Sequence, residues 1–330
     1  MRRRQTGPKV VAIGGGNGLS TMLRGLKNRV HDLTAIVTVA DDGGGSGMLR
    51  QDLGMLPPGD IRNCMQSLAN VEPIMRDLLA YRFTEGSLTG QSFGNLLLAA
   101  LNGICGSFDQ AVARMSEVLA ISGRVLPVTN ENVQLEATFE NGTHVVGESR
   151  IFQFKKEQDC RIQRVRLIPE RPKPLPDAID AIRRADLVIL GPGSLYTSVI
   201  PNLLVEGVPQ ALAQTEAMKM YVCNIMTQEG ETEGMTAADH VEALIEHGLP
   251  GMVDLCLCNS APVPEALIAR YQAENAGPTV VDRERLAKLG VELVEAAVTS
   301  GNAQFARHDP DRLAEAILYA YEERAQTKIF

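Results

Sequence analysis

The stretch that decides the fold is VVAIGGGNGLSTMLRGL, residues 10–26 of the 330-residue chain. Four apolar residues lead directly into residues 14–18, of which four are glycine, and an apolar pattern with helical spacing follows. Glycine lets a bare backbone approach another group closely, and the start of a helix directs N–H groups and partial positive charge toward it. The stretch therefore predicts a strand, a tight turn and a helix, with an anion as the natural ligand.

Two other predicted strands end in the same way. Residues 35–40 (AIVTVA) run into DDGGGSG at 41–47, and residues 186–190 (DLVIL) run into GPGSLYTS at 191–198. We call residues 14–18, 41–47 and 191–198 the first, second and third loops. In an open parallel sheet such loops lie along the carboxyl edge of the strands, where ligands bind at the point of strand-order reversal. We expect the three loops to form one cradle for a diphosphate.

The glycine pattern does not match either of the two common phosphate-binding motifs. GxGxxG starting at Gly14 would need glycine at position 19, where Leu19 stands, and a Walker A loop would need Gly-Lys at positions 19 and 20. Neither a standard dinucleotide fold nor a P-loop ATPase is supported.

The remaining pattern predicts one α/β domain over residues 1–330. Strand-like and helical runs alternate along most of the chain, which is typical of a parallel sheet covered by helices on both faces. In residues 125–168 the apolar period changes to two, with Asn141-Gly142 as a hairpin turn. We predict a Rossmann-like, doubly wound, mainly parallel sheet in a three-layer α/β/α arrangement, with an antiparallel β insertion at 125–168.

Composition excludes several classes of function. The net charge is −8, the pI is near 5.3 and tryptophan is absent, so neither a basic face for duplexes nor a stacking platform for single strands is expected. The basic run Arg2–Arg4 is not followed by an apolar signal segment, and no run is long enough to span a membrane. The six cysteines lack paired CxxC spacing. We expect a cytoplasmic protein that binds no nucleic acid.

The charges around the loops limit what each can bind. The first and third loops carry no lysine, arginine, aspartate or glutamate, so backbone donors would hold the phosphates, with help from Arg50 or Arg62. Asp41 and Asp42 would repel a phosphate, and they should bind sugar or ribose hydroxyls or hold Mg²⁺. Asp60 either caps a helix or joins this group.

The candidate phosphate- and nucleotide-binding residues are glycines and polar residues in or beside the loops. They are Gly14, Gly15, Gly16, Asn17 and Gly18 in the first loop; Gly43, Gly44 and Ser46 in the second; Gly191, Gly193, Ser194, Thr197 and Ser198 in the third; and Arg62, Asn63, Ser92, Asn95, Asn202 and Asn224 beside them. Asp41, Asp42 and Asp60 are the sugar or Mg²⁺ candidates, Mg²⁺ being the only cofactor we consider. Glu229, Glu231 and Glu233 should form the solvated face of a flexible loop over the ligand.

Long motifs resemble one known family. VVAIGGGNGLSTMLRGLK, VTVADDGGGSGMLRQDLGMLPPGDIRNC, GQSFGNLLLAAL, LGPGSLYTSVIPNLLV and YVCNIMTQEGETEGMTAADHVEALIEHG are similar to the YvcK branch of the CofD-like superfamily. This resemblance implies a Rossmann-like fold and a cytoplasmic gluconeogenesis factor linked to cell shape and envelope synthesis. It also implies binding of UDP-sugars such as UDP-N-acetylglucosamine. The sequence departs from the branch at Gly45, where serine is usual, and at Gln91, where histidine is common.

Two functions from different classes follow. The first is a regulatory protein that binds a UDP-sugar or another nucleoside diphosphate and signals to an unknown protein partner in envelope synthesis. The alternative, from the resemblance to 2-phospho-L-lactate transferase CofD, is an Mg²⁺-dependent enzyme that moves a phosphoester group from a nucleoside diphosphate donor to an alcohol. No nucleophile and base pair is visible, so we name no catalytic residue and lean toward binding. We also expect a homodimer, with residues 125–168 as its surface.

Overall fold

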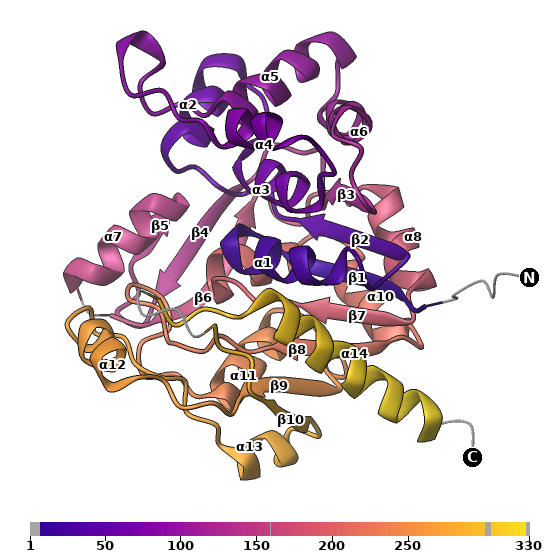
Figure 1. The fold of residues 1–330 in the computed structure, drawn as a ribbon. Coiled ribbons are helices and arrows are strands. Elements are labelled where there is room, and N and C mark those ends of the chain that lie inside the picture. The colour runs from indigo at the N-terminus through magenta and orange to yellow at the C-terminus, as the bar shows by residue number, and fades with distance from the viewer. Residues whose placement is uncertain (1–6, 159, 301–304, 328–330) are drawn as a thin grey trace, which may run out of the picture.

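The computed structural model describes residues 7–158, 160–300 and 305–327, so Arg2–Arg4 lie outside the described residues. Its central sheet has seven parallel strands in the order β10-β9-β8-β7-β1-β2-β3. The strands are β1 Lys9–Gly14, β2 Asp32–Val37, β3 Arg124–Pro127, β7 Leu187–Leu190, β8 Met218–Val222, β9 Leu255–Asn259 and β10 Glu292–Ala296. The predicted fold class is confirmed (Figure 1).

The central strands are apolar because both faces of the sheet are covered. All four residues of β7 are buried, as are five of the six in β1. At the edge, β10 carries Glu292 and Glu295 on exposed positions. Apolar runs without alternation therefore mark the middle of the sheet.

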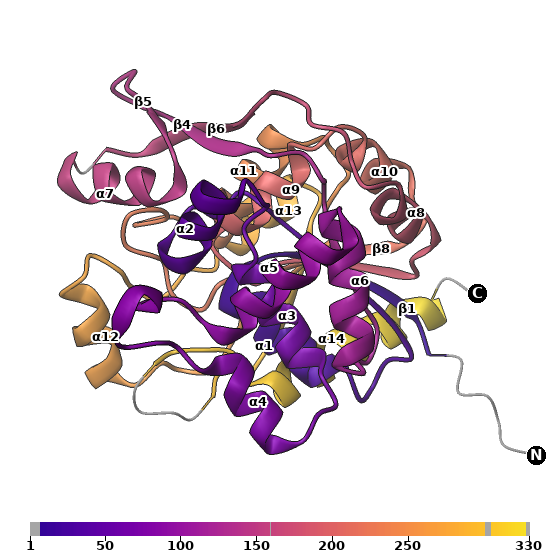
Figure 2. The ribbon, with the colours of Figure 1, turned by 90° about the horizontal axis from the view of Figure 1, so that it is seen from above.

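Helices lie on both sides of these strands, as Figure 2 shows. On one side are α1 (Gly16–Leu26), α3 (Gly59–Leu68) and α14 (Pro310–Thr327), and on the other are α8 (Pro176–Arg184) and α10 (Val208–Gln214). In α1 the buried residues Leu19, Met22, Leu23 and Leu26 recur at helical spacing, which gives the helix one apolar face.

The other helices connect or extend these layers. They are α2 Gly44–Leu53, α4 Pro73–Ala80, α5 Phe93–Cys105, α6 Phe108–Val118, α7 Glu148–Gln158, α9 Ile200–Leu203, α11 Ala237–His247, α12 Glu265–Gln272 and α13 Arg283–Lys288. A 3-10 turn, η1 (Gly86–Leu88), and a π-helical turn, η2 (Leu195–Val199), complete the description. Across the described residues, no helix combines the length and the apolarity that a membrane crossing requires.

The insertion is a second, three-stranded antiparallel sheet that begins later than predicted. Its strands are β4 (Gln134–Phe139), β5 (His144–Val146) and β6 (Ile162–Ile168), in the order β5-β4-β6. The Asn141-Gly142 turn joins β4 to β5 as expected, with Gly142 at a φ of +80°. Residues 125–127, however, pair with β2 in the main sheet, and α7 interrupts the strands. A short apolar run does not show to which sheet a strand belongs, or whether the segment is a strand or a helix.

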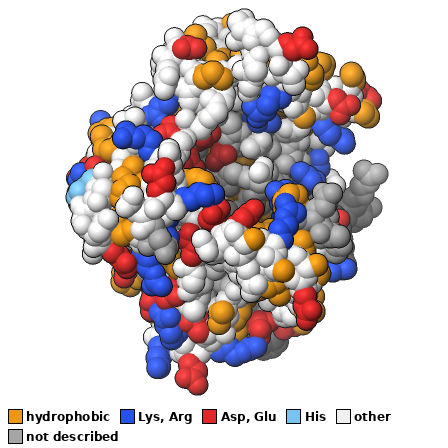
Figure 3. All heavy atoms as spheres, turned by 90° about the vertical axis from the view of Figure 1, so that its left-hand side faces the viewer, with side chains coloured by type: hydrophobic (Ala, Val, Ile, Leu, Met, Phe, Trp, Pro, Cys, Tyr) orange, Lys and Arg blue, Asp and Glu red, His pale blue; other side chains and the backbone are white. Residues whose placement is uncertain are grey.

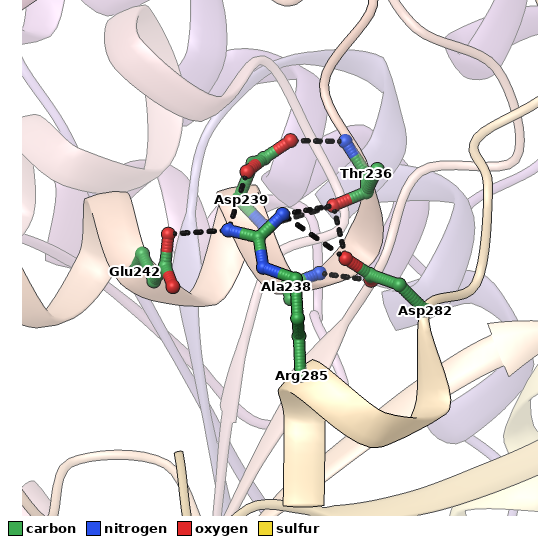
Figure 4. A network of polar contacts seen from close by, with 6 residues as sticks. All are labelled: Thr236, Ala238, Asp239, Glu242, Asp282 and Arg285. Atoms are coloured by element: carbon green, nitrogen blue, oxygen red, sulfur yellow. Dashed lines mark hydrogen bonds and ion pairs between the residues drawn. The ribbon is translucent and has the colours of Figure 1, made fainter. Parts of the chain in front are cut away.

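A polar network fastens α11 to α13 (Figure 4). Thr236 caps α11 and forms a capping box with Asp239. Arg285 of α13 contacts Asp239, Glu242 and Asp282, at 2.8, 2.7 and 3.2 Å respectively. The network therefore joins the start of α11 to α13.

The strand order reverses at β1. From β1 the chain continues to β2 and β3 on one side, whereas β7, β8, β9 and β10 follow on the other. The crevice beyond the carboxyl ends of β1 and β7 is therefore the topological switch point, which is where α/β sheets of this kind bind ligands. The first and third loops both start there.

Gly25 of α1 packs directly against the start of α14, which generates the first prediction. A Cβ at this position would lie 1.9 Å from the Pro310 carbonyl oxygen. We expect Gly25→Ala to lower the free energy of unfolding, measured in urea, by about 1 to 3 kcal/mol through overpacking. Gly103→Ala in α5 is the control, since nothing lies within 4 Å of its Cβ position. It should be neutral or stabilising by up to about 1 kcal/mol, and equal losses in both variants would contradict this packing.

Candidate functional site

A pocket of about 640 Å³ opens at the switch point. Figure 3 shows a hollow in the face that carries α7 and α12, with acidic side chains along it. Nine of the predicted site residues line the pocket: Gly16, Asn17, Gly18, Asp41, Asp60, Gly193, Ser194, Ser198 and Asn224. The structure thus brings together parts of all three loops, and a volume of this size suits a nucleotide-sized ligand.

The backbones of the first and third loops touch each other. A Cβ on Gly18 would lie 2.5 Å from the carbonyl oxygen of Pro192, and one on Gly193 would lie 3.1 Å from that of Gly15. Asn224 fastens the third loop from β8, because its side chain donates to the Gly193 carbonyl at 2.8 Å and accepts from the Gly193 N–H at 3.3 Å. Glycine is required here for contact between loops, before any ligand is considered.

Asp60 lies beneath the start of α1. Its carboxylate accepts a hydrogen bond from the Gly16 N–H, and a Cβ on Gly15 would lie 2.4 Å from its Oδ2 atom. Burial, and then the charge of Asp41, raises the pKa of Asp60 to about 7. The structure places Asp60 in the first turn of α3, where Pro58 is the cap. It is therefore a pocket carboxyl that changes charge near neutral pH.

Asp41 plays a similar part at the second loop. It accepts the Gly43 N–H at 2.8 Å and a hydrogen bond from the Ser46 hydroxyl. Burial raises the pKa of Asp41 despite these bonds, and the charge of Asp42 adds to the shift. Gly43 and Ser46 thus support Asp41, and neither they nor Gly44 line the pocket.

Glu231 holds the third loop, and this corrects the expectation for residues 229, 231 and 233. Its Oε1 atom accepts the N–H groups of Tyr196 and Thr197 at 2.8 and 2.9 Å, at the start of η2. The side chain is buried, and burial raises the pKa of Glu231 to about 7. Two of the amides that the third loop could offer to a phosphate are therefore occupied by the protein's own carboxyl group.

The two neighbouring glutamates are also held. Glu229 forms an ion pair with Lys156 at 3.3 Å, and Glu233 forms one with Lys155 at 3.1 Å, both in α7. The three side chains are not a solvated face, because the insertion covers this segment. The sequence around these glutamates does not reveal their lysine partners, which lie about seventy residues earlier in the chain.

Glu148 is a pocket carboxyl that the sequence analysis missed. It is the first residue of α7, in the insertion, and it lines the pocket together with Phe152. Burial raises the pKa of Glu148 well above its ordinary value, and the charges of Asp41 and Asp60 add to the effect. The Thr197 hydroxyl contacts both Glu148 and Glu231. The insertion thus contributes to the site itself.

Other predicted residues lie outside the pocket lining. Arg62 donates to the Asn95 side chain at 3.2 Å and to Gln66 at 3.3 Å, between α3 and α5. Ser92 caps α5 by accepting the Asn95 N–H at 3.3 Å. The remaining predicted residues outside the lining are Gly14, Gly15, Asn63, Gly191 and Thr197, together with Asn202 and Asp42.

Asn202 and Asp42 each make a structural connection. The Asn202 side chain is fully buried, and its amide group donates to the carbonyls of Gly14 and Ser198, at 3.2 and 2.8 Å, and also to that of Val199. Asp42 faces away from the pocket and accepts the N–H and hydroxyl of Ser149. Asn202 therefore ties the end of β1 to η2, and Asp42 ties the second loop to α7.

The far wall of the pocket was also not predicted. It includes Tyr271, Phe305 and Arg307, and the guanidinium carbons of Arg307 and Arg270 lie 4.6 and 5.0 Å from the centre of the Phe305 ring. Among the described residues that line the pocket, Arg307 is the one lysine or arginine, against five acidic side chains. No motif marks these residues, since they lie far along the chain from the glycine loops.

The two departures from the branch pattern are neighbours in space. A Cβ on Gly45 would lie 2.9 Å from Oε1 of Gln91, and both residues are buried. Glycine at position 45 therefore leaves room for the glutamine side chain. The pair lies behind the second loop and not in the pocket lining.

The carboxyls have the chemistry of an Mg²⁺ site, with a limit on the number of protein ligands. Asp41 and Asp60 are oxygen donors in one pocket, but the described residues contain no group of three or more side chains placed to hold a metal. Mg²⁺ is commonly bound through one or two carboxylates and the phosphates of a ligand. The residues present fit that arrangement, in which the ion would reduce the charge of a bound diphosphate.

Comparison with known proteins gives one consistent result. The sequence model of the family 2-phospho-L-lactate transferase CofD matches residues 10–299. A putative gluconeogenesis factor of Thermoanaerobacterium thermosulfurigenes is 54% identical over 94% of this chain and 96% of its own length. The gluconeogenesis factor of Bacillus subtilis is 48% identical over 96% and 99%. A crystal structure of a protein from Bacillus halodurans superposes with a TM-score of 0.90 at 46% identity, covering 94% of this chain and 99% of the other.

The raised pKa of Glu231 makes stability depend on pH. With a folded-state value of about 7 and an ordinary value near 4.3, the folded chain holds an extra proton between these limits. The stabilising contribution is complete below about pH 4 and is lost as the pH rises through 7. We expect the free energy of unfolding of the wild type, relative to Glu231→Gln, to fall by about 1 to 3 kcal/mol between pH 5 and pH 8.

Glu284→Gln on the exposed side of α13 is the control for this comparison, and it should show no such change. Urea unfolding at several pH values measures both differences. A difference between wild type and Glu231→Gln that stays constant with pH would contradict the proton assignment.

Proposed function

Since the chain belongs to the CofD family and matches gluconeogenesis factors over nearly its whole length, we propose that it is a regulatory protein that binds a nucleotide sugar. The ligand class is UDP-sugars, with UDP-N-acetylglucosamine as the example to test. The observation that carries the proposal is the pocket at the switch point, where the first and third loops meet beside Asp41 and Asp60. Such a pocket takes the phosphates at its loops and the rest of the nucleotide sugar along its walls.

Charge limits how a diphosphate enters this pocket. Five acidic side chains face one arginine, so a fully ionised pocket would repel the ligand. The raised pKa of Asp60 and that of Glu148 allow these carboxyls to take up protons and become hydrogen-bond donors. The start of α1 supplies the remaining positive field through Asn17 and Gly18.

The far wall suits the other parts of a nucleotide. Tyr271 and Phe305 offer aromatic faces for a base, and Arg307 offers the one cationic group of the described lining. Asp41 would accept hydrogen bonds from the hydroxyl groups of ribose or of the sugar. Asn224 is committed to Gly193 through both ends of its amide, so it supports the third loop and does not read the base.

Regulation is proposed because the described residues of the pocket lining supply carboxyls and backbone amides, and no nucleophile among them is paired with a base. Ligand binding would then change how the chain acts on a protein partner in envelope synthesis. Such a role would account for the link to cell shape that the family resemblance implies. Phe152 and Glu148 of the insertion line the pocket, so a bound ligand would contact this surface directly. A homodimer through the insertion remains part of the same proposal.

A second candidate is favoured by the carboxyl pair. Asp41 and Asp60 could hold Mg²⁺ with a diphosphate, and the matched family model is that of a transferase. In that case an alcohol would attack the phosphorus of the donor and release a nucleoside monophosphate. Native mass spectrometry of the purified chain separates the two: a UDP-sugar that co-purifies supports the first, and a guanosine nucleotide together with turnover in Mg²⁺ supports the second.

Ser194 lines the pocket and donates to Gln228 at 2.7 Å. We expect Ser194→Asp to weaken UDP-N-acetylglucosamine binding by at least roughly tenfold in titration calorimetry, because it adds a negative charge beside the phosphates. Ser87→Asp, on the exposed turn η1, should bind like the wild type. Equal affinity of the wild type and both variants would show that the third loop does not contact the ligand.

Proton uptake by the pocket makes the affinity depend on pH. A diphosphate raises the pKa of Asp60 further, so without metal the affinity should fall as the pH rises from 6 to 8. Asp60→Asn removes this titrating group and should flatten the profile. Calorimetry in two buffers of different ionisation enthalpy counts the protons. An Asp60→Asn variant with an unchanged slope would show that Asp60 does not face the ligand.

A further inference from the structure

A second hollow, of about 750 Å³, lies behind the second loop. We call it the α2 groove. It is bordered by Arg50 and Gln51 of α2, by Asn132 and Gln134 before and in β4, and by Arg150 of α7. From the sequence, Arg50 or Arg62 was expected to help hold the phosphates, yet the Arg50 side chain lines the groove and not the first pocket.

One thin wall separates the groove from the first pocket. The wall consists of the Asp41-Asp42 turn and the start of α7, where Ser149 donates its N–H and its hydroxyl to Asp42 at 2.9 and 2.8 Å. Asp41 and Glu148 line the first pocket, whereas Asp42 and Ser149 line the groove. The two hollows are therefore distinct sites, and consecutive residues in the wall face opposite ways.

The two hollows carry opposite charge. Asp42 is the one acidic residue among the described groove lining, and it is already hydrogen-bonded to Ser149. Two arginines lie beside it, and neither forms an ion pair among the described residues. The first pocket has five acidic side chains and one arginine. With two arginines against one acidic residue, the charges of the described groove lining favour an anion.

Arg50 lacks partners that a guanidinium group requires. Its Nη2 atom donates to the Val133 carbonyl, while its Nη1 atom is buried without any hydrogen-bond partner. Burial lowers the pKa of Arg50, although the charges of Asp42 and Asp41 act in the opposite direction. Arg150 is exposed, and within the described residues it has no hydrogen bond or ion pair. Arginines in this state bind phosphate groups well, because their donors form a planar fork.

The rest of the lining indicates what carries the anionic group. Gln51, Asn132 and Gln134 present amide side chains, which both donate to and accept from hydroxyl groups. The described lining contains no aromatic side chain, in contrast to Phe152, Tyr271 and Phe305 in the first pocket. A nucleotide base would find no stacking surface, whereas a polyhydroxylated molecule would find partners for its hydroxyls.

We propose that the α2 groove is a second ligand site, which binds a small hydroxylated molecule that carries a phosphate group, such as a sugar phosphate. Arg50 and Arg150 bind the phosphate, and the three amide side chains bind the hydroxyls. This site does not depend on the proposed function of the first pocket. A ligand in the groove would contact the same wall, at Asp41 and Asp42, that borders the first pocket.

Titration calorimetry with glucose 6-phosphate, inorganic phosphate and glucose tests the proposal. We expect glucose 6-phosphate to bind with one-to-one stoichiometry, inorganic phosphate to bind more weakly, and glucose not to bind. Arg150→Met should weaken glucose 6-phosphate binding by roughly 10- to 100-fold, as expected for loss of hydrogen bonds to a charged group. Because Arg150 is exposed and unpaired among the described residues, this variant should fold normally.

Further variants locate the ligand. Arg50→Met should weaken binding to a similar extent, while Arg114→Met on α6 should have no effect, since that arginine lies 64% exposed beside Glu117. Arg307→Met in the first pocket should also leave glucose 6-phosphate binding unchanged. The proposal is overturned if the wild type binds none of the three probes, if glucose binds as well as glucose 6-phosphate, or if Arg307→Met abolishes binding while Arg150→Met does not.

Discussion

Direct contact between two glycine-containing backbones determines the centre of this molecule. A Cβ on Gly18 would lie 2.5 Å from the Pro192 carbonyl oxygen, too close for any side chain, and one on Gly193 would lie 3.1 Å from the Gly15 carbonyl oxygen, a tight contact. Because β1 and β7 are neighbours at the point where the strand order reverses, this contact brings the starts of α1 and η2 together. The pocket exists because these two helix starts meet there.

Carboxyl groups complete the same structure. Asp60 accepts the amide of Gly16, Asp41 accepts that of Gly43, and Glu231 accepts those of Tyr196 and Thr197. Each bond satisfies a donor near a helix start, so the ligand-free loops have defined positions. The cost is electrostatic, because burying several carboxyls in one region raises the pKa of each. Clusters of buried carboxyl groups with raised pKa values are typical of functional sites.

The sequence predicted the features that depend on local pattern. Apolar runs such as residues 10–13 and 187–190 identified strands covered on both faces, and Asn141-Gly142 identified a hairpin turn. The glycine loops were placed correctly, although glycine proved necessary for contact between loops and not only for a ligand. Residues 125–127 were assigned to the insertion because a short apolar strand has the same pattern in either sheet.

Residues that join the site through tertiary structure were not predictable. Glu148 belongs to the insertion, Glu231 to a loop after β8, and Arg307 to the segment before α14, so no motif spacing relates them to the first loop. Arg62, conversely, follows a glycine loop in sequence, but it points to Asn95 between α3 and α5. Distance along the chain from a motif therefore does not predict which residues line the pocket, whereas the strand order does predict where the pocket lies.

A crystal structure of the chain with UDP-N-acetylglucosamine tests the central claim most directly. The account predicts that the diphosphate lies at the switch point, within hydrogen-bond distance of the amides at Asn17 and Gly18 and beside Ser194, with the base toward Tyr271 and Phe305. Ligand density anywhere outside this pocket, with the first and third loops untouched, would contradict it.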